Sequence, residues 1–168
     1  SCYRIVNHLN GAIEPGFSLD KFGRELILNW HRDSWTPQNE ATWKKISTEL
    51  KMPVWVNGKD LKKKIGVENK DIWSVKDNAG TFEIRSDILA SPGLFLNQRL
   101  QRKWVADQSK DKSVLNLFAN TGTYAVAAAL GQAKEISVVE ISKNYLSWAK
   151  RNFELNALDV DNVKFLNR

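Results

Sequence analysis

Apolar and polar residues alternate near the start of the chain in the pattern of a β-hairpin. Phe17 and Leu19 alternate with polar neighbours, and a second apolar stretch covers residues 25–30. Between them, residues 20–23 (Asp-Lys-Phe-Gly) have the composition of a turn. This segment is therefore predicted to form two antiparallel strands joined by a short loop.

A helix with one apolar face is predicted to follow the hairpin. The hydroxyl group of Thr36 can cap its first turn, and Pro37 suits the first helical position. Trp43, Ile46 and Leu50 recur at spacings of three and four residues, which places them on one side of the helix. We expect that side to face the core of a small domain.

The pattern is less decisive after this helix. Pro53 ends it, and residues 54–56 (Val-Trp-Val) indicate a short strand. Residues 57–78 are polar and predict no element; the three lysines at 62–64 form either a solvated surface or a contact for RNA phosphates. Residues 81–88 alternate again. The first part of the chain is thus expected to have the order β-β-α-β with one further strand.

Strand-like and helix-like segments alternate in the second part of the chain. The expected elements are a helix at 97–108, a strand at 113–118, a helix at 124–130, a strand at 136–140, a helix at 143–156 and a strand at 163–166. The order β-α-β-α-β implies a parallel sheet with right-handed crossovers. In the helix at 97–108, Leu100 and Trp104 form the apolar stripe that we expect to be buried.

This change of pattern predicts an α/β chain with two domains. Residues 1–90 would form a small α+β accessory domain, and residues 91–168 would form the first half of a Rossmann-like domain. A length of 168 residues is consistent with two small domains. Because a half-built sheet leaves its third strand as an unpaired edge, we expect the chain either to form a homodimer or to have lost a longer tail by proteolysis after folding.

Composition narrows the class of protein only slightly. Hydrophobic residues make up 42% and charged residues 26% of the chain, as in an ordinary soluble domain. The net charge of +6 favours a polyanionic partner such as RNA. Cys2 is the only cysteine, so no internal disulfide can form, which fits a reducing compartment. Since no membrane-length apolar run, metal-ligand cluster or signal peptide is apparent, we expect a cytoplasmic protein that binds neither membranes nor metal.

The most informative segment is residues 114–124, in which an apolar strand leads through a small-residue turn into a helix. Ligands of such units bind at the carboxyl ends of the strands, where the free N–H groups of a helix N-terminus suit a nucleotide or a carboxylate. Glu140 closes the next strand, 18 residues beyond Gly122. That spacing is near the one expected for an acid that accepts hydrogen bonds from ribose hydroxyls.

Glu140 alone does not distinguish NAD from S-adenosylmethionine, because both contain the ribose diol. A dinucleotide site needs three glycines so that the pyrophosphate can approach the helix, whereas this turn contains Gly122 alone. The residues therefore favour S-adenosylmethionine, which has no phosphate. A nicotinamide-dependent oxidoreductase is the first alternative, and an RNA-binding module without catalysis is the second.

With these residues in view, the chain resembles the bacterial and archaeal ribosomal RNA methyltransferases of the cytosine-C5 type. That family has an N-terminal PUA domain, a central α+β domain and a Rossmann-like domain of the class I methyltransferase type. The matching segments are residues 3–23, which resemble the entry to the family's central domain, 93–99 with Arg102 (similar to TGFFLDQRxxR), 116–124 (similar to NCFSYTGGF), 139–142 (similar to VDxS) and 151–156 (similar to xNxELN). The resemblance implies that residues 1–90 are the central domain and that residues 91–168 begin the methyltransferase domain.

The resemblance also implies a set of residues that bind S-adenosyl-L-methionine. They are Gln98, Arg99, Asn116, Phe118, Ala119, Asn120, Thr121, Gly122, Glu140, Ile141, Ser142 and Asn156. Other roles stay open for some of them. Asn116 could be a polar strand end, Gln98 and Arg99 could cap a surface helix, and Asn156 could simply end one.

The chain departs from the family pattern at Asn97, Asn120 and Thr123, where Asp, Tyr and Gly are usual. In the family, an Asp-Pro-Pro motif and the cysteine that attacks cytosine C6 come later than the segment ending at Arg168, and Cys2 does not match that cysteine. We therefore expect no catalytic residue in this fragment and no turnover by it alone. The implied function is methylation of a base of ribosomal RNA by the parent protein.

Overall fold

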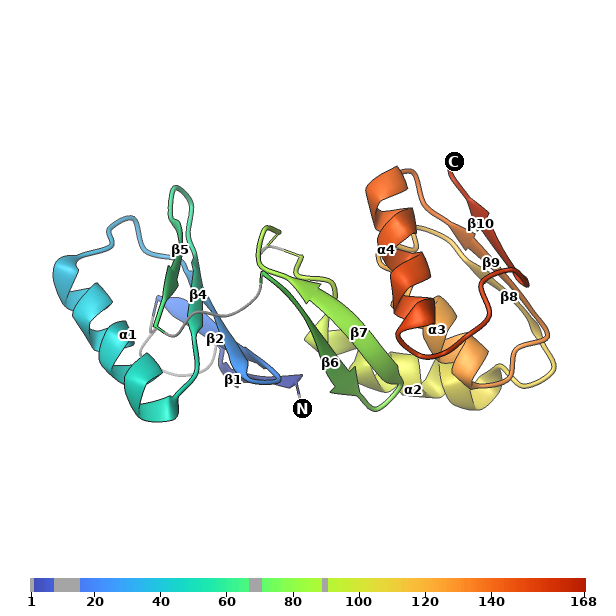
Figure 1. Cartoon of the computed structure of the whole chain (residues 1–168), viewed down its shortest axis with the longest axis horizontal. Coiled ribbons are helices and arrows are strands. Elements are labelled where there is room, and N and C mark those ends of the chain that lie inside the picture. The colour runs from blue at the N-terminus through green and yellow to red at the C-terminus, as the bar shows by residue number, and fades with distance from the viewer. Residues whose placement is uncertain (1, 8–15, 67–70, 89–90) are drawn as a thin grey trace. The chain divides into compact units, whose positions relative to one another are not determined.

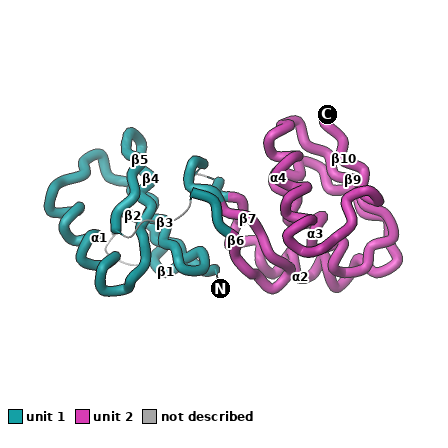
Figure 2. Tube along the Cα trace, viewed as in Figure 1, with its two compact units in different colours: residues 1–73, 85–92 teal, residues 74–84, 93–168 magenta. Residues whose placement is uncertain are grey.

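The structure is a computed structural model that describes residues 2–7, 16–66, 71–88 and 91–168 (Figure 1). The chain divides into two compact units (Figure 2). The first unit comprises Ser1–Trp73 and Arg85–Pro92, and the second comprises Ser74–Ile84 and Gly93–Arg168. The segment 74–84 thus packs with the second unit although it precedes residue 90. The predicted domain boundary at residue 90 stays a prediction.

The first unit is built on a five-stranded sheet in the order β1-β2-β3-β4-β5. Its elements are β1 (Cys2–Val6), β2 (Phe17–Phe22), β3 (Glu25–Trp30), α1 (Pro37–Leu50), β4 (Val54–Asn57) and β5 (Lys62–Ile65). Strands β3 and β4 are parallel, and the other neighbours are antiparallel. Of the family-like segment at 3–23, residues 8–15 lie outside the described residues.

The predicted hairpin is confirmed, but the prediction of its turn was wrong. Phe22 pairs with Glu25, so that Gly23 and Arg24 form the loop and residues 20–22 belong to β2. Gly23 has a φ of +68°, in the left-handed region that short hairpin loops require. The position of this glycine, rather than the polar residues before it, determines where the chain reverses.

Helix α1 begins as predicted, with the hydroxyl group of Thr36 accepting a hydrogen bond from the backbone N–H of Asn39. Trp43 is buried, but Leu50 is 53% exposed, so the prediction that Leu50 faces the core was wrong. Ser47 is buried instead, and its hydroxyl donates to the carbonyl oxygen of Met52 at 2.6 Å. Leu50 is the last residue of α1, and Lys51 turns the chain away with a φ of 52°.

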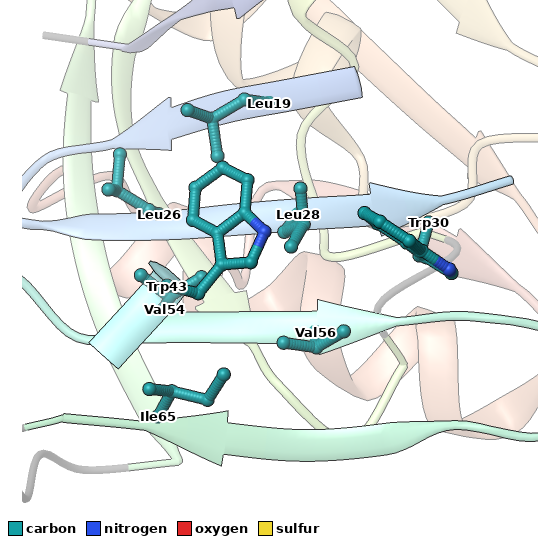
Figure 3. Packing of buried hydrophobic residues seen from close by; sticks show 8 residues of the cluster. All are labelled: Leu19, Leu26, Leu28, Trp30, Trp43, Val54, Val56 and Ile65. Atoms are coloured by element: carbon teal, nitrogen blue, oxygen red, sulfur yellow. The ribbon is translucent and has the colours of Figure 1, made fainter. Parts of the chain in front are cut away.

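The core of the first unit lies between α1 and one face of the sheet (Figure 3). Its buried members are Leu19, Leu26, Leu28, Trp30, Trp43, Val54, Val56 and Ile65. Trp43 extends from the helix over the side chains of the central strands (Figure 3). Residues between these positions along each strand point to the opposite face of the sheet.

Residues 57–78, which predicted no element, contribute two strands. The lysines at 62–64 lie in β5, where the ammonium group of Lys63 pairs with Glu40 and that of Lys64 lies 4.7 Å from the centre of the Trp55 ring. The ion pair with Lys63 lowers the pKa of the Glu40 carboxyl group. Two of the three lysines thus have partners within the chain, and their contact with RNA stays a prediction.

The second unit contains a parallel three-stranded sheet, as predicted, and its strand order is β10-β9-β8. It begins with the hairpin strands β6 (Ile72–Asp77) and β7 (Gly80–Arg85), of which residues 72, 73 and 85 belong to the first unit. The elements that follow are the 3-10 turn η1 (Leu96–Gln98), α2 (Arg99–Gln108), β8 (Ser113–Asn116), α3 (Thr123–Leu130), β9 (Glu135–Val139), α4 (Lys143–Glu154) and β10 (Val163–Leu166). Helices α3 and α4 pack against each other, and α3 also packs against β8 and β9 (Figure 1).

The prediction for the buried face of α2 was wrong. Leu100 is 76% and Trp104 is 64% exposed, whereas Arg102 is completely buried. The guanidinium of Arg102 donates to the carboxylate of Asp77 at 2.5 and 3.1 Å and to the carbonyl oxygen of Phe95 at 2.8 Å. The inner face of this helix is therefore held by an ion pair rather than by an apolar stripe.

Two asparagines of the α4 region bind the edge of β7 that is not paired with β6. Asn156 accepts from the N–H of Thr81 at 2.8 Å and donates to its carbonyl oxygen at 2.7 Å. The side-chain oxygen of Asn152 accepts from the N–H of Glu83 at 2.8 Å. These side chains pair with β7 as a neighbouring strand would, which fixes the hairpin to the second unit.

Two kinds of feature are absent from the described residues. No helix in them is long and apolar enough to cross a membrane. They also contain no group of three or more His, Cys, Asp or Glu side chains that could hold a metal ion.

Candidate cofactor site

The loop after β8 has an unusual backbone conformation. Phe118, Asn120 and Gly122 have φ angles of 49°, 50° and 70°, so every second residue is left-handed. Gly122 is also the N-cap of α3. A Cβ atom on Gly122 would lie 2.7 Å from the Cβ atom of Ala149 in α4, which explains why a glycine is required at this position.

Glu140 connects this loop to the one after β9. Its carboxylate accepts hydrogen bonds from the backbone N–H of Asn120 at 2.8 Å and from that of Ser142 at 2.9 Å, one on each oxygen. Its side chain is largely buried, with 8% of the residue exposed. Each carboxylate oxygen can accept a second hydrogen bond, so both remain able to bind two neighbouring hydroxyl groups.

The underside of the loop rests on buried polar groups. The hydroxyl of Thr121 donates to the carbonyl oxygen of Gly93 at 2.7 Å, and the amide of Asn152 donates to the carbonyl oxygen of Thr121 at 2.8 Å. Asn152 is completely buried and also holds Glu83 of β7. It therefore links the loop, α4 and the hairpin. Asn152 was missed as a site residue, although it lies within the family-like segment 151–156.

The outer side of the site is apolar and accessible. Phe118 is 92% and Ile141 is 81% exposed, which is unusual for side chains of this size. The side-chain oxygen of Asn116, at the end of β8, is buried without a hydrogen-bond partner. Apolar surface, an unpartnered acceptor and a carboxylate are thus present at the carboxyl edge of the sheet.

The structure brings most of the predicted cofactor-binding residues together. Asn116, Phe118, Ala119, Asn120, Thr121 and Gly122 form one continuous strand end and loop, and the N–H of Ala119 binds the carbonyl oxygen of Val139 beside the Glu140–Ser142 segment. Three other residues are placed differently. Arg99 pairs with Asp77, its Nε lying 2.9 Å from Oδ1, Asn156 binds β7, and Gln98 ends the turn η1 before α2.

Comparison with known proteins identifies the family. The model of a family described as S-adenosylmethionine-dependent methyltransferase matches residues 58–168. The chain belongs to this family. The match covers the whole of the loop after β8 and Glu140, so the predicted preference for S-adenosylmethionine over a nicotinamide cofactor is confirmed.

Individual relatives agree with this assignment. The ribosomal RNA large subunit methyltransferase K/L of Pseudoalteromonas atlantica is 40% identical over 177 residues, covering 94% of this chain and 24% of that protein. The ribosomal RNA large subunit methyltransferase K of Neisseria meningitidis serogroup B is 30% identical over 167 residues, covering 89% of this chain and 47% of that protein.

A solved structure from Streptococcus mutans, assigned as a S-adenosylmethionine-dependent methyltransferase, superimposes with a TM-score of 0.83 at 22% identity. The superposition covers 99% of this chain and 46% of that chain, and it confirms the predicted class I methyltransferase fold. This chain spans less than half the length of each of these three proteins.

Proposed function

We propose that this protein transfers a methyl group from S-adenosylmethionine to a base of large-subunit ribosomal RNA. The observation that carries the proposal is the position of Glu140, whose carboxylate is fixed by two backbone N–H groups at the carboxyl edge of the parallel sheet. The names of the two relatives support ribosomal RNA as the substrate. A cytoplasmic location and a homodimer remain expectations of the same proposal.

The residues present fit the cofactor. Glu140 would accept hydrogen bonds from the ribose hydroxyls, and the exposed side chains of Phe118 and Ile141 would cover the adenine ring. The unpartnered oxygen of Asn116 would accept from the amino group of the methionine part. When bound, the cofactor supplies an electrophilic methyl group, and these residues bind and orient it.

The cytosine-C5 specificity is a finer hypothesis, which rests on the resemblance alone. It requires a cysteine nucleophile. Cys2 lies in β1 and is completely buried, so it is not that nucleophile. Mass spectrometry of the nucleosides of treated ribosomal RNA would identify the methylated base, and a product other than 5-methylcytosine would contradict this hypothesis.

The first test is a calorimetric titration of S-adenosylhomocysteine into the wild-type chain, the Glu140→Ala variant and a Glu135→Ala control. Glu135 is an exposed acid at the opposite end of the same strand, β9. We expect Glu140→Ala to weaken binding at least about tenfold, because hydrogen bonds to a charged group contribute about 1.5–3 kcal/mol. The control should bind as the wild type does.

Glu140→Ala also removes the support of the loop, so a second measurement isolates the ribose contact. The 2′-deoxy analogue of S-adenosylhomocysteine should bind the wild-type chain more weakly than the parent compound, and the variant should not distinguish the two. Equal binding of both compounds by the wild-type chain would show that Glu140 does not hold the ribose. Failure of the wild-type chain to bind either compound would contradict the proposed cofactor site.

A non-catalytic RNA-binding module is the remaining alternative, favoured only by the net charge of +6. Transfer of radiolabelled methyl groups to large-subunit ribosomal RNA by the protein would exclude it.

A further inference from the structure

The first unit contains a cavity of about 640 Å³ that is separate from the residues of the cofactor site. It is lined by the ends of β3 and β4 and the residues that follow them, among them Asn29, Arg32, Asn57 and Lys59, and also by residues of β1 and β2. Because β3 and β4 are parallel, both strands end at this cavity. Asn29 and Asn57 alternate with core residues, so they lie on the face of the sheet opposite α1.

Two paired amides form the polar part of this cavity. Asn29 and Asn57 are register partners, and the amide of Asn57 donates to the side-chain oxygen of Asn29 at 3.0 Å. Within the described chain, the side-chain N–H groups of Asn29 and the side-chain oxygen of Asn57 make no hydrogen bond to another group, which leaves a donor and an acceptor side by side. Adjacent donors and acceptors are what a nucleic-acid base presents on its edges.

Two positively charged side chains, Arg32 and Lys59, line the cavity. The guanidinium carbon of Arg32 lies 5.8 Å from the centre of the Trp30 ring (Trp30 is labelled in Figure 3), and its side chain packs on the backbone of Gly16, where a Cβ atom would lie 2.1 Å from Nε. Among the described residues, no carboxylate forms an ion pair with Arg32 or Lys59. Both charges are therefore available to an anion from outside the chain.

The other charges of the lining do not cancel this preference. Arg4 is already bound to Asp20 through two hydrogen bonds of 2.7 and 2.9 Å. Asp33 is the one carboxylate among the described lining residues, so a single negative charge faces the two positive charges of Arg32 and Lys59. The cavity also falls within the range of about 300–1,000 Å³ that is usual for small-ligand sites, so an isolated nucleotide unit can enter it.

We propose that this cavity binds one nucleotide of single-stranded RNA, with its phosphate at Arg32 and Lys59 and its base edge at Asn29 and Asn57. The inference rests on the proposed function and deepens it, because it names where the first unit holds the RNA substrate. Phosphate contacts of this kind give affinity and salt dependence, whereas contacts to base edges give sequence preference. The two pairs of residues can therefore be tested separately.

The test measures binding of a short fluorescein-labelled single-stranded RNA to the full chain by fluorescence anisotropy across a salt series. The double variant Arg32→Gln/Lys59→Gln is compared with Lys44→Gln/Lys45→Gln, which removes the same charge from the exposed side of α1 in the same unit. We expect the cavity variant to bind at least about tenfold more weakly and to lose about 0.7 from the salt slope, because the site holds one phosphate and each phosphate contact contributes about 0.7. The control should stay within about twofold of the wild type.

A second variant, Asn29→Ala, tests base recognition with homopolymeric RNAs. It should reduce the preference among poly(A), poly(C) and poly(U) while leaving the salt slope unchanged. A wild-type chain without any such preference, or a variant that alters the slope alone, would overturn the base contact. Equal losses in both double variants, or no binding of RNA by the wild-type chain, would overturn the cavity as an RNA site.

Titration of S-adenosylhomocysteine into the same samples separates this inference from the proposed function. Retained cofactor binding shows that the variants are folded in the second unit, and circular dichroism checks the first. If the cofactor binds but RNA ignores the cavity variants, only the RNA site fails. If the wild-type chain binds no cofactor, the proposed function itself fails.

Discussion

Asp77 lies at the end of β6, where two arginines of α2 converge on its carboxylate. Its side chain is 1% exposed, that of Arg102 is 0% exposed, and their closest approach is 2.5 Å. Arg99 adds a further charge at 2.9 Å from Oδ1, although the angle at Nε lies outside hydrogen-bonding geometry, so its contribution is Coulombic. Replacing Asp77 with asparagine keeps the shape of the side chain and removes its charge.

The expected cost follows from burial. Removing one partner of a buried ion pair leaves the other charge without compensation, which costs about 3–5 kcal/mol. The substituted amide would keep one oxygen as an acceptor, so we expect Asp77→Asn to lower the free energy of unfolding by about 3 kcal/mol. The matched control is Asp107→Asn, because Asp107 pairs with Lys103 on the same helix with both side chains more than half exposed. It should change stability by less than about 0.5 kcal/mol.

Urea unfolding monitored by tryptophan fluorescence gives the free energies, and hydrogen exchange of the α2 and β7 amides assigns the loss to the second unit. A cost below about 1 kcal/mol for Asp77→Asn, or equal costs for both variants, would refute the reasoning. It would mean that the hairpin is held by its asparagine contacts alone and that the buried pair contributes little.

Three further predictions concern other positions. Burial raises the pKa of the Glu25 carboxyl above its usual value of 4.5, so the folded state favours the protonated form. The free energy of unfolding should therefore be highest below pH 4.5 and should fall as the pH rises through the raised pKa. Glu25→Gln should remove this fall in urea titrations at several pH values. Gly122→Ala should lower stability by more than about 1 kcal/mol and weaken S-adenosylhomocysteine binding, since its φ is +70° and its Cβ atom would meet Ala149. Trp104→Gln should leave the free energy of unfolding within about 0.5 kcal/mol of the wild type, because Trp104 is 64% exposed; a larger loss would show that this side chain is buried in solution.

Local patterns predicted the parallel part of the second unit correctly. Each of its strands is short and apolar, and each helix carries its own start or stop signal, such as the hydroxyl of Ser142, which accepts from the N–H of Tyr145, or Gly131 at the end of α3. Such signals act within one turn of the chain, so a sequence reveals them directly. The position of Glu140 was predictable for the same reason, because it follows from the end of a strand.

What the sequence did not reveal depends on partners far away along the chain. Arg102 is buried because Asp77, 25 residues earlier, meets it, and the apolar-stripe rule therefore assigned the wrong face of α2. The backbone N–H groups of Asn120 and Ser142 donate hydrogen bonds to the Glu140 carboxylate, and Asn120 does so from a left-handed backbone conformation. Patterns of side chains along the sequence do not reveal that conformation. Only the folded structure shows that Glu140 stabilises the loop, in addition to its proposed contact with ribose.

The attachment of β7 to α4 has a consequence for how the chain is made. The N–H of Glu83 finds its acceptor in Asn152, 69 residues later, and that of Thr81 finds its acceptor in Asn156, 75 residues later. During synthesis the hairpin leaves the ribosome well before α4 does. The backbone N–H groups of Thr81 and Glu83 therefore stay hydrogen-bonded to water until α4 has emerged. If the gene were divided at residue 90, the second unit would be made without residues 74–84 and would lack its hairpin. Contacts between residues so far apart in sequence predict that the second unit folds late and slowly.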